Sequence, residues 1–73
     1  METVRPLDVL NNAKGKEVTV ELKNSEVYKG KVKAFDIHLN FVLFETVQIV
    51  EGKDIPVGNM LIRGDAIMTI KNI

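Results

Sequence analysis

Apolar and polar residues alternate along much of this chain, as in β-strands that have one buried and one solvent-facing side. The alternation predicts one strand within residues 17–23 and a second within residues 27–34. The apolar positions are Val18, Val20 and Leu22 in the first strand, and Tyr28, Gly30, Val32 and Ala34 in the second. The other face of the second strand carries Lys29, Lys31 and Lys33, which we interpret as a solvated strand face.

A third segment, Phe41–Phe44, is apolar on both faces, which predicts a strand that is covered on both sides. Residues 36–40 separate it from the second strand and are too polar to continue either one. Gly30 lies inside the second strand, where glycine usually marks a sharp bend. The pattern therefore predicts a long, bent hairpin whose tip displays a carboxylate, an imidazole and an amide. Polar groups on a loop held by rigid strands are often binding groups.

A short helix is predicted before the strands, over Arg5–Asn12. Pro6 suits a first helical turn, and Leu7 and Leu10 are three residues apart on one face. Two helical turns are not stable alone, so this apolar face must dock on another element. The Phe41–Phe44 strand is the candidate.

Two further strands are predicted after a charged turn at residues 51–54. They are Ile55–Ile62 and Ala66–Ile70, and residues 63–65 interrupt them. The expected fold is therefore all-β, a single domain over residues 1–73, with a short N-terminal helix and a five-stranded, strongly bent antiparallel sheet or small open barrel. Its last two strands are apolar and would be edges, which must be covered or paired. Pairing them between copies head to tail closes a ring or extends a fibre.

Composition narrows the function classes. A chain of 73 residues has a small core, and with no cysteine it has neither a disulfide framework nor a thiolate metal site. We expect no metal and no cofactor, and stability gained by oligomerisation. A net charge of zero argues against a broad electrostatic surface for nucleic acid. Without an apolar run near 18 residues or an export leader, we expect a cytoplasmic protein with no membrane partner.

Two motifs resemble those of the Sm and Sm-like (Lsm) family. Residues 27–45 follow the family's first motif, with Gly30, Asp36 and Asn40 at its polar and glycine positions. Residues 60–67, MLIRGDAI, resemble its second motif, and the Arg-Gly form is similar to the archaeal and eukaryotic branch. The family often has methionine where this chain has Leu39. With the helix, the resemblance covers residues 5–71.

The resemblance implies a ring, most often of seven identical subunits, that binds U-rich single-stranded RNA at its central pore in RNA processing or RNA–protein assembly. His38 and Arg63 match the positions that sandwich a uracil base, and Asn40 matches the position that reads its edge. Asp36, Gly64 and Asp65 match supporting positions.

The residue chemistry agrees with that implication. Imidazole and guanidinium groups are flat, and a base can stack between them. An amide offers a donor and an acceptor side by side, but it can flip unless a neighbour fixes it. A carboxylate accepting from the amide NH₂ would fix it. We assign this role to Asp65, with Asp36 bracing the loop backbone as an alternative.

Two other classes remain open. An enzyme could use Asp36 with His38, or His38 with Asp65, as an acid–base pair, but no serine or cysteine nucleophile lies in a recognisable setting. We therefore expect no catalysis. A ring-shaped or SH3-like scaffold that binds proteins would ignore oligo(U) and would tolerate mutation of the loop.

Overall fold

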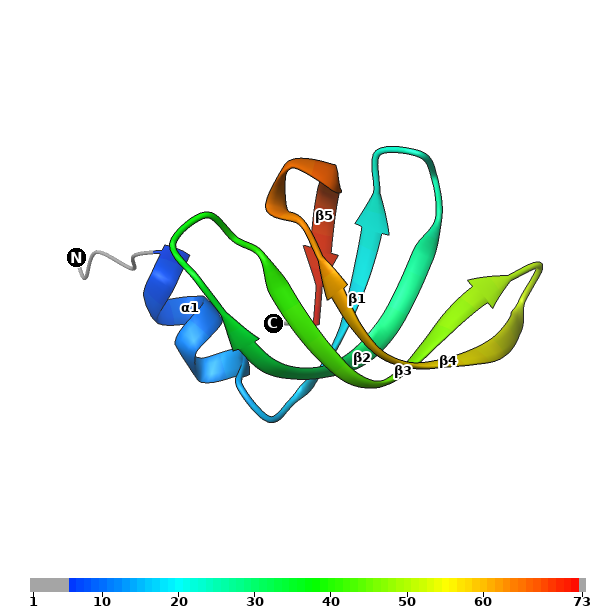
Figure 1. Ribbon diagram of the computed structural model, residues 1–73, viewed down its shortest axis with the longest axis horizontal. Coiled ribbons are helices and arrows are strands. Elements are labelled where there is room, and N and C mark those ends of the chain that lie inside the picture. Colours follow the sequence, from blue (N-terminus) through cyan, green and yellow to red (C-terminus); the bar gives the residue numbers. More distant parts are fainter. Residues whose placement is uncertain (1–5, 73) are drawn as a thin grey trace.

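The computed structural model describes residues 6–72 (Figure 1). Within that range no helix is long and apolar enough to cross a membrane. The elements in chain order are helix α1 (Pro6–Ala13), strands β1 (Glu17–Leu22), β2 (Val27–Phe35), β3 (Phe41–Val50) and β4 (Lys53–Ile62), the 3₁₀ turn η1 (Gly64–Ala66), and strand β5 (Ile67–Lys71).

The five strands form one antiparallel sheet in the order β4-β3-β2-β1-β5. The predicted all-β fold, a helix followed by a strongly bent five-stranded sheet, is confirmed. The two strands predicted to be edges, β4 and β5, are the edges of this sheet. The outer ends of β3 and β4 project away from the rest of the molecule (Figure 1), which accounts for its elongation to 41 × 22 × 21 Å.

The core lies inside the bend of the sheet and is closed by the helix. Leu10 and Ala13 of α1 belong to the same buried cluster as Phe41 and Leu43 of β3, so the predicted docking of the helix is confirmed. The helix ends at Ala13, one residue later than predicted. The predicted first residue, Arg5, lies outside the described residues, as does the side chain of Leu7. The remaining members of the cluster are Val18, Val20, Tyr28, Val32 and Ile62.

The prediction that Ala34 shares the buried face of Tyr28 is wrong, because the sheet contains a bulge. Val32 pairs with Leu43 and Ala34 pairs with Val42, so Lys33 is an extra residue on β2. One extra residue reverses the side to which all later side chains of a strand point. Ala34 is therefore exposed on the outer face.

Strand β3 is less covered than its sequence predicted. Phe41 and Leu43 are fully buried, but Val42 and Phe44 on the outer face are half-buried. The ammonium of Lys33 lies 5.4 Å from the centre of the Phe44 ring, which gives that face a cation–π contact in place of a packed layer. Strand β4 begins two residues before the predicted Ile55, and β5 starts and ends one residue later than predicted.

The sharp bend of β2 at Gly30 depends on a close approach to β3. A Cβ atom on Gly30 would lie 2.8 Å from Oγ1 of Thr46 and 3.2 Å from Cβ of Leu43. A second bulge occurs opposite it, with Glu45 at a φ of +52°. Thr46 is buried, and its hydroxyl has no hydrogen-bond partner among the described residues. Glycine is thus required at position 30 because a Cβ atom would clash with β3, and not because of an unusual backbone conformation.

Replacing Gly30 with alanine should lower the free energy of unfolding by about 1–3 kcal/mol, the usual range for overpacking a core. Thermal or denaturant unfolding measures the loss. In the double variant Gly30→Ala/Thr46→Ala, part of the loss should be recovered, because the nearest clashing atom is gone. Strictly additive effects of the two substitutions would contradict this account of the bend.

Candidate functional site

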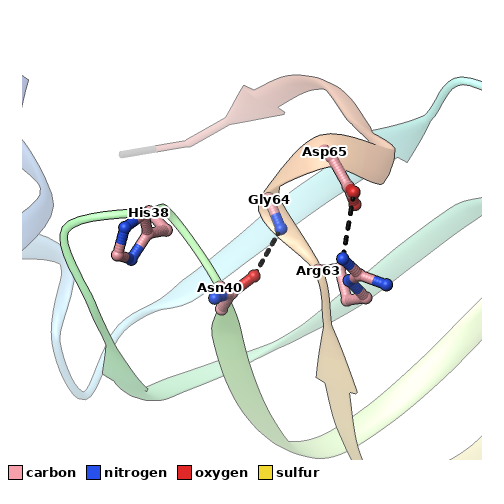
Figure 2. A pocket seen from close by; sticks show the side chains of 5 residues that line it. All are labelled: His38, Asn40, Arg63, Gly64 and Asp65. Carbon is pink, nitrogen blue, oxygen red and sulfur yellow. Dashed lines mark hydrogen bonds and ion pairs between the residues drawn. The ribbon is translucent and has the colours of Figure 1, made fainter.

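An open pocket of about 540 Å³ lies where two connecting segments meet. One segment is the loop between β2 and β3, and the other follows β4 and forms η1. The pocket is lined by His38, Asn40, Arg63, Gly64 and Asp65 (Figure 2). The structure therefore brings together five of the six site residues that the sequence predicted, although 23 residues separate Asn40 from Arg63 in the chain.

The sixth residue, Asp36, holds the β2–β3 loop in shape from behind the pocket. Its Oδ1 accepts hydrogen bonds from the backbone N–H groups of His38, at 2.9 Å, and Asn40, at 3.0 Å. The backbone closes the same loop, because Leu39 N–H donates to the Asp36 carbonyl at 3.0 Å. Leu39 has a φ of +61°, an unusual conformation for leucine that the surrounding hydrogen bonds maintain.

Gly64 joins the two segments at close range. Its backbone N–H donates to Oδ1 of Asn40 at 2.9 Å (Figure 2). A Cβ atom on this residue would lie 2.1 Å from the carbonyl oxygen of His38 and 2.9 Å from that of Leu39. Any side chain larger than hydrogen would separate the segments, so glycine is required here for the pocket to form.

The side-chain amide of Asn40 is fixed at both ends. Its Nδ2 donates to Oδ2 of Asp36 at 3.0 Å, while its Oδ1 accepts from Gly64 N–H. A flipped amide would place its oxygen against the carboxylate and its NH₂ against a backbone donor, and both contacts would be repulsive. Apart from these contacts, the amide retains one N–H and one oxygen lone pair with which to bind a ligand.

Our assignment of the amide-fixing role to Asp65 is wrong, because Asp36 performs it together with its bracing of the loop backbone. Asp65 instead forms an ion pair with Arg63, with 3.2 Å between its Oδ2 and Nη2 of the guanidinium (Figure 2). The spacing of Asp36 and Asn40, four residues apart at the two ends of one tight loop, was the sequence signal for the contact.

The two flat groups of the pocket lie on either side of the amide. In the view of Figure 2, Asn40 and Gly64 separate the imidazole of His38 from the guanidinium of Arg63. Both side chains belong to exposed residues, so their ring and guanidinium faces are accessible to a planar ligand. The site combines two stacking surfaces with a central, oriented donor–acceptor pair.

Charges near the pocket are balanced rather than uniformly basic. The hydrogen bond from the Asn40 side chain, followed by those from backbone N–H groups, lowers the pKa of Asp36 below its ordinary value of 3.8. Within residues 6–72, no cluster of His, Cys, Asp or Glu side chains is arranged to hold a metal ion. The geometry is that of a site for a neutral, planar group.

Two lysines of β2 are paired with carboxylates on β3 and β4. Lys31 forms an ion pair with Glu45 at 2.9 Å, which raises the pKa of Lys31 and lowers that of Glu45. Lys29 lies 4.0 Å from Asp54. These pairs support the interpretation of the lysine face as a solvated strand surface, because two of its three charges are compensated locally.

The model of the LSM domain family matches residues 8–72, nearly all of the sequence. The chain belongs to the LSM domain family. The resemblance to Sm and Sm-like proteins that its two motifs indicated is therefore confirmed. In this LSM domain, the first motif forms the bent hairpin and the β2–β3 loop, and the second forms the end of β4 and η1.

Relatives of this LSM domain are archaeal. The snRNP Sm-like protein of Methanosarcina barkeri is 40% identical over 67 residues, which cover 90% of this chain and 93% of the relative. A Pyrococcus abyssi Sm protein, solved in complex with a uridine heptamer, is 38% identical with a TM-score of 0.85, covering 92% of this chain and 96% of that one. A heptameric archaeal Sm protein is 32% identical with a TM-score of 0.84, covering 86% and 93%.

The lowered pKa of Asp36 predicts how the loop responds to acid. A carboxylate whose pKa is lower in the folded state stabilises that state fully above its unfolded value, and this contribution is lost as the pH falls through the folded value. The Asn40 side-chain NH₂ resonances should therefore be constant at neutral pH and shift in acid, with a midpoint below the ordinary aspartate pKa of 3.8.

An NMR titration of the Asn40 amide tests this prediction, with Asp36→Asn as the control. In that variant the Asn40 resonances should sit near their acid positions already at neutral pH and should lose the acid transition. A transition that persists unchanged in Asp36→Asn would show that another group controls the loop.

Proposed function

We propose that this protein assembles into a heptameric ring, as its heptameric archaeal relative does, and binds U-rich single-stranded RNA at the central pore. The observation that carries the proposal is the Asn40 amide, which is fixed at both ends and faces an open pocket between two flat groups. A role in RNA processing or RNA–protein assembly in the cytoplasm follows from this activity. It is a binding role and not a catalytic one.

The fixed amide matches uracil better than cytosine. Uracil presents a carbonyl acceptor beside a ring N–H donor, and these complement the remaining N–H and the oxygen of Asn40. Cytosine presents an amino donor beside a ring nitrogen acceptor, so it would need the flipped amide, which Asp36 and Gly64 N–H disfavour. The fixed orientation thus supports a preference for uracil.

Stacking supplies the affinity that edge reading alone lacks. A base between the His38 imidazole and the Arg63 guanidinium would gain about 1–3 kcal/mol from stacking. One such site binds weakly, but sites repeated around a ring see the next tethered base at a high effective concentration. A uridine heptamer bound to the Pyrococcus abyssi relative supports this arrangement.

The two free edges of the sheet support assembly. Leu61 on β4 is 64% exposed and Met68 on β5 is 59% exposed, which is unfavourable for apolar side chains in water. Pairing β4 of one copy with β5 of the next would cover both. The two edges differ, so the contact is head to tail, and it either closes a ring or extends a fibre. The heptameric archaeal relative supports seven subunits.

Competition between U-, C- and A-tracts for the wild type and three variants tests RNA binding. Arg63→Ala should abolish tight oligo(U) binding, because it removes one stacking surface from every subunit. His38→Ala should weaken binding but keep the preference for U over C. Asn40→Ala should reduce that preference, since hydrogen bonds of about 0.5–1.5 kcal/mol each are lost from the base edge.

Lys31→Ala is the matched control, because it removes a cation from the outer face of the sheet and should bind like the wild type. Light scattering should give a mass near seven times 8.2 kDa for all of these proteins. If Asn40→Ala keeps full discrimination, the edge-reading role is wrong. If intact rings of all three site variants bind like the wild type, RNA binds elsewhere on the ring. If the wild type ignores oligo(U), the protein is a scaffold for other partners.

The absence of cysteine from the sequence allows a direct test of the β4–β5 contact. The double variant Leu61→Cys/Met68→Cys, treated with a short bismaleimide, should give a ladder of covalent species up to the heptamer. Each single variant should remain monomeric on a denaturing gel, because equivalent residues of neighbouring subunits lie apart in a head-to-tail ring. Equal cross-linking of a single variant would instead indicate a two-fold, edge-to-edge dimer.

A further inference from the structure

The ion pair between Arg63 and Asp65 engages a nitrogen of the guanidinium that a phosphate could also use. Oδ2 of Asp65 lies 3.2 Å from Nη2, one of the terminal nitrogens that carry N–H donors. Carboxylates and phosphates both bind such donors. The Arg63 side chain is 76% exposed, so the rest of the guanidinium is accessible.

The balance of charge around the pocket disfavours anions further. Arg63 is the cation among the residues that line it, and Asp65 lies beside it. Asp36 adds a second carboxylate next to the pocket, held in the ionised form by the hydrogen bonds that it accepts. With a neutral His38, the six site residues together carry a net charge of −1. A phosphate would meet no uncompensated positive charge here.

We propose that Asp65 is a specificity-determining residue that makes this pocket select nucleobases over phosphates. It compensates the charge of Arg63 and engages one terminal nitrogen of its guanidinium, while the exposed group stays accessible for stacking. Affinity then depends on an accessible, unpaired base and not on the density of backbone charge. This inference rests on the proposed function and adds to it a means of rejecting duplexes and other polyanions.

The alternative is that the exposed pair has no effect on ligands. Surface ion pairs contribute about 0–1 kcal/mol to folding, and Asp65 is itself 69% exposed. However, a phosphate beside Arg63 responds to the local electrostatic potential, which does not depend on how much the ion pair stabilises the fold. A negative charge at contact distance from the only cation of the pocket opposes that phosphate whether or not the pair stabilises the protein.

The experiment compares Asp65→Asn with Asp54→Asn. Both substitutions remove one carboxylate from an ion pair and change the net charge equally, but Asp54 pairs with Lys29 at the far end of β4 from the pocket. Asp65→Glu, which keeps the charge, is the rescue variant. The probes are nine-nucleotide oligo(U), nine-nucleotide oligo(C) and inorganic polyphosphate, which has charge but no base. Binding is measured between about 50 and 200 mM salt on rings checked by light scattering.

Asp65→Asn should bind polyphosphate about three- to tenfold more tightly than Asp54→Asn at the lowest salt. Its log–log salt dependence for both oligonucleotides should steepen by about 0.7 for each phosphate that is newly paired. Its preference for U over C should fall, because phosphate contacts are the same for both tracts. Asp65→Glu should resemble the wild type.

Two results would overturn the inference. One is equal polyphosphate affinity and equal salt dependence for Asp65→Asn and Asp54→Asn, which would reduce the effect to net charge. The other is weaker oligo(U) binding by Asp65→Asn without a steeper salt dependence, which would mean that Asp65 only positions Arg63 for stacking. Failure of the proposed function is separate, since the wild type itself would then not bind oligo(U).

Discussion

The hydrogen bond from Gly64 N–H to the Asn40 side chain is the contact on which the site depends. It joins the loop between β2 and β3 to the segment that follows β4, and it is possible only because residue 64 has no side chain. Without it the Asn40 amide would be held at one end, and the two segments would not enclose a pocket. The register of β3 and β4 serves this contact, because Ile62 pairs with Phe41 and so places the end of β4 beside the β2–β3 loop.

The site also shows how one residue can have several structural roles when a loop is short. Asp36 fixes the backbone of the loop through one carboxylate oxygen and the amide of Asn40 through the other. The same group therefore determines both where the amide lies and which way it faces. In the proposed RNA site, base preference would therefore depend on a carboxylate that does not itself line the pocket.

Much of the fold could be predicted from the sequence, because strands with one buried face leave a strong alternating pattern. The residues that line the pocket could be predicted as well, but only because two motifs occur together; His38 alone, in a turn, indicates nothing. The partners of the carboxylates could not be predicted. Whether Asp36 or Asp65 reaches Asn40 depends on loop geometry, including the positive φ of Leu39, which the residue type disfavours. The register beyond Lys33 was missed for a similar reason, since nothing in the sequence marks the bulge.

That bulge divides β2 into two parts whose even-numbered side chains point to opposite faces of the sheet. Up to Val32, even-numbered positions face the interior, and a polar substitution there would be buried. From Ala34 onward the even-numbered position faces outward, beside Val42 and Leu61, which line a shallow apolar depression with it. A single strand thus contributes first to the core of its own subunit and then to the outer surface. Tolerance to polar substitution along β2 should therefore keep its two-residue repeat but change phase at Lys33. A hydrophobicity profile averaged over the whole strand will consequently underestimate how amphipathic each part is.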